Sequence, residues 1–283
     1  MGRCEENIKV FADTVELTES SKPLLMSIMN TWNSQQFIPA GAENAIPEVR
    51  RDQEAGIIVS SRRTLEAASA YEGRKVCILN FASATNAGGG VTNGSMAQEE
   101  CICRCSTLYF CLTQDGMESC FYEPHRAAGN PLYNDDMIYS PGVTVFKSDT
   151  DHPERLPEDK WYQVNVITCA APNLRRRPSN AMNPNAGTHA ASISEGDLEK
   201  LLEARIRRIF AVAFEKRNEV LILGAFGCGA FCNPPEVVAR VFHRITAEYR
   251  YCFETIEYAV YHTEREAANY QAFRRAFRNE VAE

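Results

Sequence analysis

One stretch, residues 76–100, constrains the fold of this chain more than any other. It begins with the apolar run 76–81 (Val-Cys-Ile-Leu-Asn-Phe), which is typical of a short buried strand. Three glycines follow at 88–90, and without side chains their backbone can adopt positive φ and lie close against a ligand. Ser95 stands in a favourable N-cap position with Gln98 three residues later, as in a capping box. The stretch therefore predicts a strand, a glycine loop and a helix N-terminus, an arrangement that suits an anion.

Two adjacent carboxylates, Glu99 and Glu100, fall in the first turn of that predicted helix. Acidic residues at a helix N-terminus complement the helix dipole, so the simplest interpretation is a pair of surface residues. Consecutive side chains on a helix point about 100° apart. We therefore expect the two glutamates to have different roles, with at most one of them facing a scissile bond.

A second glycine loop lies at residues 224–233, between a predicted strand at 220–223 and a predicted helix at 236–249. It contains three glycines and no charged residue. Two loops of this kind, each following a strand, can hold the phosphates of a ligand between them. Either loop alone would be consistent with an ordinary tight turn. The pair, with an acidic helix start beside one of them, predicts a ligand site.

The rest of the chain alternates predicted strands and helices, which is typical of an α/β sandwich. The further strands are predicted at 57–59, 135–139, 143–146, 161–169 and 253–261, and the further helices at 64–71 (with Thr64 as its cap), 198–216 and 265–277. A Ser-Pro-Gly turn at 140–142 is expected to separate two of the strands. Residues 115–129 and 173–197 show no clear periodicity and are expected to be irregular.

Residues 1–55 are predicted to form a helical extension packed on a main domain that spans 56–283. Apolar residues recur at helical spacing from 24 to 32, after a proline at 23 that suits the start of a helix. Residues 41–47 are predicted to form a linker. Plain packing is the simplest role for the extension, and a lid or a partner surface is the alternative.

Charge and cysteine content narrow the class of protein. The 283-residue chain has a formal net charge of −7, which argues against direct binding of a nucleic-acid backbone, because that needs a basic surface. No run approaches the ~20 apolar residues of a membrane helix, and no signal peptide is visible. Eleven cysteines, an odd number, indicate reduced thiols in a cytoplasmic protein rather than disulfides.

Closely spaced cysteines raise the alternative of a metal site. They are Cys101, Cys103, Cys105, Cys228 and Cys232. Their spacing lacks the C-x2-C pairs of structural zinc sites, and on a helix only the first and third would share a face. We therefore predict that they are small hydrophobic side chains, and that the chain needs no metal and no cofactor.

The order of the two loops resembles a known family. Gly-Gly-Gly followed by Gln-Glu-Glu resembles the signature of poly(ADP-ribose) glycohydrolases, and more closely that of their bacterial-type branch in the macrodomain superfamily. The runs 80–90, 98–109 and 223–234 (Leu-Gly-Ala-Phe-Gly-Cys-Gly-Ala-Phe-Cys-Asn-Pro) carry this resemblance, which spans about residues 56–265. Ala87 departs from the pattern, since proline is common there, and should loosen the turn slightly.

The resemblance implies a macrodomain-like three-layer α/β/α sandwich with a mixed sheet, plus the N-terminal helical extension. It implies an enzyme that cleaves the ribose–ribose O-glycosidic bonds of poly(ADP-ribose) and releases ADP-ribose. Glu100 would protonate the departing ribose oxygen and then activate water, while Glu99 would hold ribose hydroxyls. The partner would be poly(ADP-ribose) or ADP-ribose, possibly attached to protein, and the chain would act as a monomer.

The same resemblance implies a set of substrate-binding residues in the two loops. The first loop would contact the distal ribose, the second would hold the diphosphate on backbone N–H groups, and Phe231 would pack on a ribose. The set is Asn86, Gly88, Gly89, Gly90, Val91, Gln98, Gly227, Cys228, Gly229, Ala230, Phe231 and Asn233.

Other functions remain open from the sequence. A macrodomain hydrolase that removes single ADP-ribose units from protein or nucleic acid would use the same pocket. A non-catalytic ADP-ribose-binding module would have no need of the intact Gln-Glu-Glu, and a structural or zinc-dependent protein would contain bound metal. Arg175, Arg176 and Arg177 form the only basic cluster of the 173–197 loop. They could contact a polymer phosphate, although a solvated charge run is the simpler interpretation.

Overall fold

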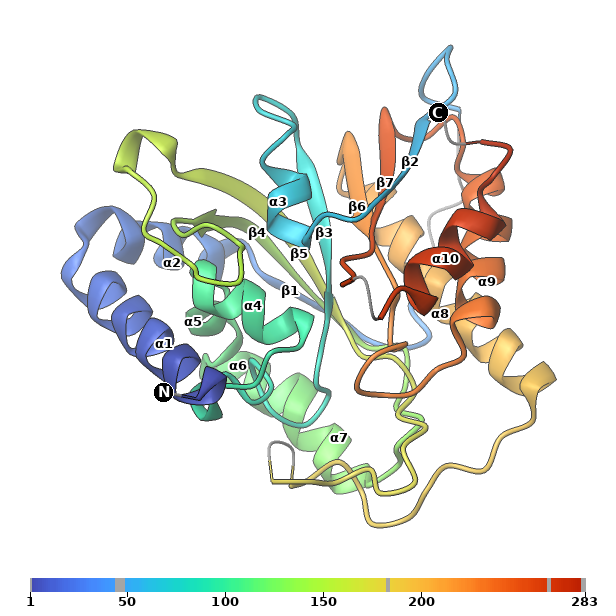
Figure 1. The fold of residues 1–283 in the computed structure, drawn as a ribbon, viewed down its shortest axis with the longest axis horizontal. Helices are drawn as coiled ribbons and strands as arrows, with labels where there is room; N and C mark the ends of the chain where they lie inside the picture. Colours follow the sequence, from blue (N-terminus) through green and yellow to red (C-terminus); the bar gives the residue numbers. More distant parts are fainter. Residues whose placement is uncertain (1, 44–48, 182–183, 264–265, 281–283) are drawn as a thin grey trace.

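The computed structural model describes residues 2–43, 49–181, 184–263 and 266–280. A seven-stranded sheet with the order β1-β4-β5-β3-β6-β7-β2 runs through the molecule (Figure 1). Its strands are β1 Gln36–Ile38, β2 Gly56–Ser60, β3 Val76–Phe81, β4 Met137–Val145, β5 Tyr162–Cys169, β6 Val220–Leu223 and β7 Thr255–Ala259. The pairs β3·β5, β3·β6, β6·β7 and β2·β7 are parallel, whereas β1·β4 and β4·β5 are antiparallel. The predicted mixed sheet is confirmed.

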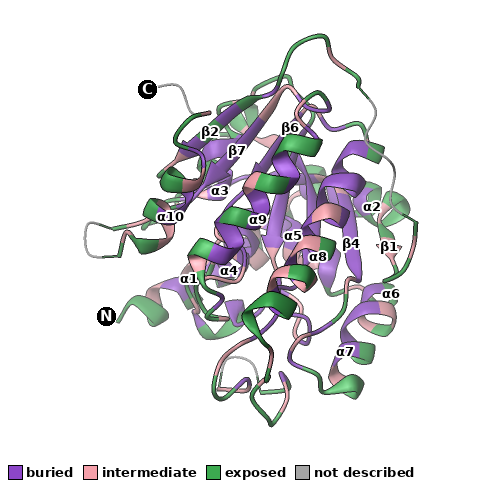
Figure 2. Ribbon diagram, turned by 90° about the vertical axis from the view of Figure 1, so that its right-hand side faces the viewer, coloured by how far each residue is buried: buried purple, intermediate pink, exposed green. Residues whose placement is uncertain are grey.

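Helices cover both faces of this sheet, which confirms the predicted three-layer arrangement (Figures 1 and 2). The helices are α1 Arg3–Ser20, α2 Lys22–Ser34, α3 Thr64–Ala68, α4 Gln98–Cys105, α5 Leu108–Leu112, α6 Asp115–Met117, α7 Glu123–Ala128, α8 Glu195–Glu215, α9 Pro235–Glu248 and α10 Ala268–Ala276. Apolar side chains of α8, α9 and α10 form one core with the sheet, and those of α1, α3, α4 and α5 form the other.

Strand β3 shows how the sequence pattern produces these layers. Its first five residues are buried, as expected for a central parallel strand that is covered on both faces. Because successive side chains point to opposite faces, Cys77 and Leu79 join the core under α8 and α9, while Val76 and Ile78 join the core under α4. Strand β6 divides its four apolar residues in the same way. The continuous apolar run therefore encodes a strand between two layers of helices.

Two predictions about secondary structure are wrong. The predicted strands 135–139 and 143–146 are one strand, β4, with an irregularity in register between Ser140 and Val143. Pro141 has no N–H to donate, and a bulge accommodates that without ending the strand. Residues 115–129 are mainly helical, because Met117, Phe121 and neighbouring side chains are buried in the core beside α5. Tertiary burial there outweighs the weak local periodicity.

The first 55 residues contribute more than helices. Helices α1 and α2 form as expected, but Gln36–Ile38 is strand β1, which pairs with β4 at one edge of the sheet. The predicted linker falls partly on residues 44–48, which lie outside the described residues. The division at residue 55 thus stays a prediction. Among the described residues, no helix is both long and apolar enough to cross a membrane.

Candidate active site

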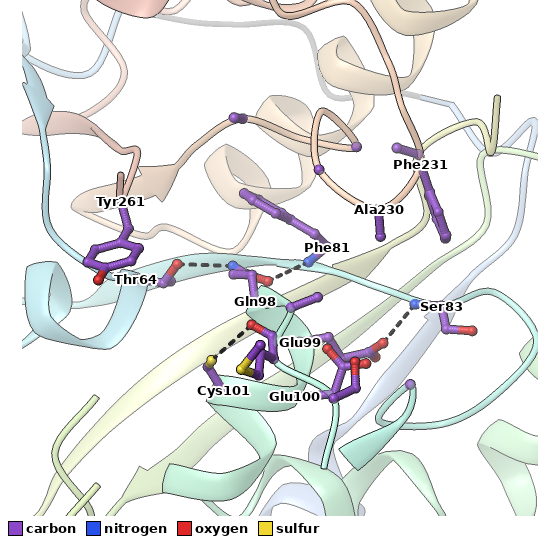
Figure 3. A pocket seen from close by; sticks show the side chains of 18 of the residues that line it. Thr64, Phe81, Ser83, Gln98, Glu99, Glu100, Cys101, Ala230, Phe231 and Tyr261 are labelled. Carbon is purple, nitrogen blue, oxygen red and sulfur yellow. Dashed lines mark hydrogen bonds between the residues drawn. The ribbon is translucent and has the colours of Figure 1, made fainter. Parts of the chain in front are cut away.

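A cavity of about 370 Å³ opens where parallel strands end. Strands β3, β6 and β7 are parallel neighbours, so their carboxyl ends meet at one edge of the sheet. The segments that follow them line the cavity together with the first turn of α4 (Figure 3). Such a crevice, outside the carboxyl ends of parallel strands, is where α/β sheets commonly bind ligands.

The first glycine loop turns sharply between β3 and α4. Gly88 and Gly89 have φ values of +70° and +59°, which favour glycine. The Asn86 side chain donates a hydrogen bond to the Gly89 carbonyl, and the Gly89 N–H donates to the Asn86 carbonyl at 2.9 Å. Asn86 therefore braces the loop from within and holds Gly89 against the cavity.

Helix α4 begins differently from the prediction. Its N-cap is Ala97, so the expected capping box of Ser95 and Gln98 is wrong. Gln98 instead ties the helix to β3: its Oε1 accepts from the Phe81 N–H at 2.9 Å, and its Nε2 donates to the Leu79 carbonyl at 2.7 Å. Because the Gln98 side chain is hydrogen-bonded to the neighbouring strand, it cannot also cap its own helix. The result is a helix N-terminus held rigidly at the cavity.

The two glutamates are buried, contrary to the surface interpretation. Glu99 is 2% exposed and Glu100 is 6% exposed, because α4 points its first turn into the cavity. Glu99 accepts hydrogen bonds from the Ser83 N–H at 2.7 Å and from Asn80 Nδ2 at 3.2 Å. Glu100 Oε1 accepts from the Gly90 N–H at 2.8 Å. The other oxygen, Glu100 Oε2, is buried and has no hydrogen-bond partner in the described part of the chain.

Both carboxylates approach Gly89, although consecutive residues of a helix point about 100° apart. A Cβ built on Gly89 would lie 3.0 Å from Glu99 Oε2 and nearer still to Glu100 Oε1. Flexible side chains thus bring both carboxylates to the same glycine. Burial, and next the charge of Glu100, raise the pKa of Glu99 well above its ordinary value. Hydrogen bonds from Ser83 and Asn80 oppose this shift only partly.

The second glycine loop faces the first across the cavity. Gly227 has a φ of +72°, and a Cβ there would lie 2.5 Å from Asn233 Nδ2. Asn233 is buried and donates from that nitrogen to the carbonyls of Pro172, at 2.7 Å, and Gly227, at 3.1 Å. No carbonyl of the described residues accepts from the N–H groups of residues 229–231. The loop therefore presents unused backbone donors, as an anion site does.

The predicted site residues separate into two groups. The cavity is lined by Gly89, Gly90, Gln98, Glu99, Glu100, Gly227, Gly229, Ala230 and Phe231. The remaining predicted residues, Asn86, Gly88, Val91, Cys228 and Asn233, are not part of its wall. Two of them brace the loops as described above, and Val91 packs in the core. Asn86 and Asn233 therefore hold the loops in shape and do not line the cavity.

Several lining residues were missed from the sequence. Arg63 and Thr64 follow β2, Ser83 follows β3, and Tyr261 follows β7. The Arg63 guanidinium lies 3.9 Å from the centre of the Tyr261 ring, and it forms an ion pair with Asp151 at 2.6 Å. All these residues follow strands of the parallel part of the sheet. Their position after predicted strands could therefore have identified them as candidates for the ligand site.

The closely spaced cysteines differ in exposure: Cys103 and Cys105 are buried, Cys101 and Cys228 are partly buried, and Cys232 is exposed. Burial raises the pKa of Cys101 to about 11 and raises the pKa of Cys103 and Cys105 well above the ordinary value. No group of three or more possible metal ligands is found among residues that the structure describes.

Comparisons with known proteins identify the family of this chain. The family model for the catalytic domain of microbial-type PARG, poly(ADP-ribose) glycohydrolase, matches residues 11–148. The crystal structure of poly(ADP-ribose) glycohydrolase from Thermomonospora curvata, bound to the inhibitor ADP-HPD, has a TM-score of 0.78 and 29% identity, over 96% of this chain and 100% of that chain. That from Deinococcus radiodurans, in complex with ADP-ribose, has a TM-score of 0.74 and 32% identity, over 88% of this chain and 96% of that chain. No match was found among curated proteins. The chain belongs to the bacterial-type poly(ADP-ribose) glycohydrolases.

Proposed function

We propose that this chain hydrolyses the ribose–ribose O-glycosidic bonds of poly(ADP-ribose), with Glu100 as the general acid and then the general base. The observation that carries the assignment to Glu100 is the state of its two carboxyl oxygens. The Gly90 N–H holds Oε1 at 2.8 Å, while Oε2 is buried without a partner in the described residues, in a side chain that lines the cavity. A fixed carboxyl with one unused oxygen is suited to exchange a proton with a bound substrate.

The reaction balances with one carboxyl group and one water molecule. Protonated Glu100 donates its proton to the departing ribose oxygen as the bond from that oxygen to the anomeric carbon breaks. The carboxylate then takes a proton from the water that attacks the anomeric carbon, which restores the acid. The products are ADP-ribose and a polymer shorter by one unit when the bond cleaved is the terminal one.

The other loop residues supply binding and orientation. We propose that the unused N–H groups of residues 229–231 hold the diphosphate and that Phe231 packs on a ribose. Glu99, beside Glu100, would hold ribose hydroxyls while Ser83 and Asn80 keep its carboxylate in place. These contacts position the bond against the acid, and positioning is a large part of enzymatic rate enhancement.

The experiment measures ADP-ribose release from purified poly(ADP-ribose), together with ADP-ribose binding by calorimetry. We expect Glu100→Gln to bind ADP-ribose and to lose roughly 10²–10⁴ in kcat, which is typical of removing a catalytic acid. Glu72→Gln, which makes the same chemical change at an exposed position, is the control and should behave as wild type.

Two outcomes would contradict the proposal in different ways. Cleavage by Glu100→Gln at the wild-type rate would exclude Glu100 as the acid. A wild-type protein that binds ADP-ribose but releases none from the polymer would instead favour mono-ADP-ribosylated targets or a non-catalytic binding module.

We also propose that the protein acts in the cytoplasm. All eleven cysteines lie among the described residues and none of them forms a disulfide; eight are buried or packed against the core. Reduced thiols are typical of proteins kept in a reducing compartment. Cell fractionation with immunodetection tests this, and recovery of the protein outside the cytoplasmic fraction would refute it.

A further inference from the structure

We propose that Arg175, Arg176 and Arg177 form a second phosphate-binding subsite, which holds the diphosphate of the neighbouring ADP-ribose unit on the leaving side of the scissile bond. This inference rests on the proposed glycohydrolase function and extends it, because it explains selection of a polymer over a single ADP-ribose unit. It is carried by three observations: where the arginines lie, how the chain holds them there, and what their charges contact.

The three arginines lie in a turn at residues 173–178, the arginine turn, which lies against the loop proposed to bind the first diphosphate. The Leu174 N–H donates to the Phe231 carbonyl at 2.9 Å, and Asn233, which braces that loop, also donates to the Pro172 carbonyl at 2.7 Å. Arg175 is partly buried and lines the cavity, while the next two arginines are exposed beside it. The basic cluster is therefore at the rim of the catalytic cavity.

Hydrogen bonds hold this turn in a defined shape. Asn173 is fully buried, and its side-chain oxygen accepts from the Arg175 N–H at 3.2 Å. Its backbone N–H donates to the Pro131 carbonyl at 2.8 Å, and its Nδ2 donates to the Pro178 carbonyl at 3.4 Å. One buried asparagine thus anchors both ends of the turn, although the segment as a whole is a loop. A preorganised turn loses less entropy when it binds a ligand.

The charges of the three arginines are uncompensated. Among the described residues, no ion pair or side-chain hydrogen bond is found for them. Other arginines differ: Arg63, which lines the cavity, pairs with Asp151, and Arg126 of α7 pairs with Glu118. Three consecutive arginines that are unpaired within the described part of the chain create a local positive potential, although the net charge of the protein is −7. Guanidinium groups bind phosphate oxygens in pairs, which suits a diphosphate.

The three arginines lie toward the end of the cavity at which the neighbouring unit of the polymer would be bound. Glu99, Glu100, Ser83 and Phe231 lie toward one end of the cavity, and Tyr261 lies at the other (Figure 3). The bond that Glu100 would cleave joins the distal ribose to a ribose of the neighbouring unit, which carries its own diphosphate. In the proposed binding mode the distal ribose lies at Glu100 and the rest of the bound unit extends toward Tyr261, so the neighbouring unit would lie at the end where Phe231 lies. The Phe231 carbonyl accepts from the N–H of Leu174, the residue before the three arginines. A target with a single ADP-ribose unit offers no second diphosphate to this subsite.

The test compares two substrates that differ only beyond the scissile bond. Poly(ADP-ribose) carries the second diphosphate, whereas an aryl α-glycoside of ADP-ribose has a phenol as its leaving group and no phosphate there. We expect the double variant R176Q/R177Q to lower kcat/KM for the polymer about tenfold at low salt. We expect kcat/KM for the aryl glycoside and binding of ADP-ribose to stay at wild-type values. Arg175 is left intact, because it lines the cavity itself.

Salt and a matched variant separate the subsite from a general charge effect. The loss should be present at about 0.01 M salt, where the Debye length is ~30 Å, and vanish near 1 M, where it is ~3 Å. The control R217Q/R278Q removes the same charge from two exposed arginines. Arg217 precedes β6, away from the carboxyl end at which the cavity lies. This control should retain wild-type activity on both substrates.

Three results would overturn the proposal. They are an unchanged kcat/KM for the polymer in R176Q/R177Q, an equal loss on both substrates, and an equal loss in the two double variants. Failure of the proposed function has a different signature, since the wild-type protein would then release no ADP-ribose from the polymer.

Discussion

A methyl group at Gly89 should remove catalysis while leaving most of the fold intact. In Gly89→Ala the new Cβ would lie 3.0 Å from Glu99 Oε2, 3.1 Å from Glu100 Cδ, and inside 3.0 Å of Glu100 Oε1. Ordinary van der Waals contact begins at 3.4 Å, so the Glu100 carboxyl must move by roughly 0.5–1 Å, and a misplacement of ~1 Å can cost ~10² in rate. The hydrogen bond from the Gly90 N–H to Glu100 would also be lost.

A second glycine variant separates the displacement of the Glu100 carboxyl from the effect of backbone strain. Gly89 has a φ of +59°, where an alanine costs about 1–2 kcal/mol. Gly73 has a φ of +77°, and no atom of the described residues lies within 4 Å of its Cβ position. Gly73→Ala therefore has a similar backbone cost without a displaced carboxylate. We therefore expect both variants to lose similar stability in thermal unfolding, and only Gly89→Ala to lose activity.

The assay is ADP-ribose release from poly(ADP-ribose), measured as kcat, alongside calorimetric binding of ADP-ribose. Binding should fall much less than kcat in Gly89→Ala, because the second loop is untouched. Wild-type kcat in a folded Gly89→Ala variant would refute the reasoning, since it would mean that the position of the Glu100 carboxyl is unimportant. Equal losses of kcat in Gly89→Ala and Gly73→Ala would refute it as well.

Three further predictions concern stability, binding and thiol reactivity. The pKa of Glu99 is raised in the folded state, so its contribution to stability is fully present below the ordinary glutamate pKa and is lost as pH rises through the raised value. Glu99→Gln should therefore raise the Tm relative to wild type at about pH 7 but not at about pH 4, and an equal difference at both values would contradict this. Gly227→Ala should weaken ADP-ribose binding at least about tenfold in calorimetry, because its Cβ would collide with Asn233 and deform the loop; unchanged affinity would show that the loop shape is not needed. A thiol-reactive chromophore should modify the exposed Cys4 and Cys232 rapidly in the native protein and the buried thiols only after unfolding, and rapid reaction of all eleven would contradict the burial described.

Local patterns predicted much of this structure because they depend on neighbouring residues. The apolar runs predicted strands β3, β5 and β6, and the recurrence of apolar residues predicted α8 and α9 to within a few residues. The two glycine loops were also recognisable, since positive φ at Gly88 and Gly227 is a local requirement. The predicted site residues that line the cavity lie in these two loops or in the helix start beside them.

Predictions failed where distant parts of the chain decide the outcome. Strand β1 is only three residues long and exists because β4 offers it an edge. Gln98 does not cap its helix because Phe81 and Leu79, which lie in another element, take its side chain. Neither partner is visible from local periodicity.

Local patterns in the sequence were sufficient to predict the strand–loop–helix units, the two glycine loops and the resemblance to the family. Tertiary packing was needed to bury Glu99 and Glu100, to bring both to one glycine, and to leave one oxygen of Glu100 without a partner among the described residues. It also decided that Arg63 and Tyr261, almost 200 residues apart, line the same cavity. The physical reason is that burial and side-chain pairing depend on which strands lie next to each other. That order is set by the packing of the whole sheet, whereas strand and helix formation is set largely by neighbours in the chain.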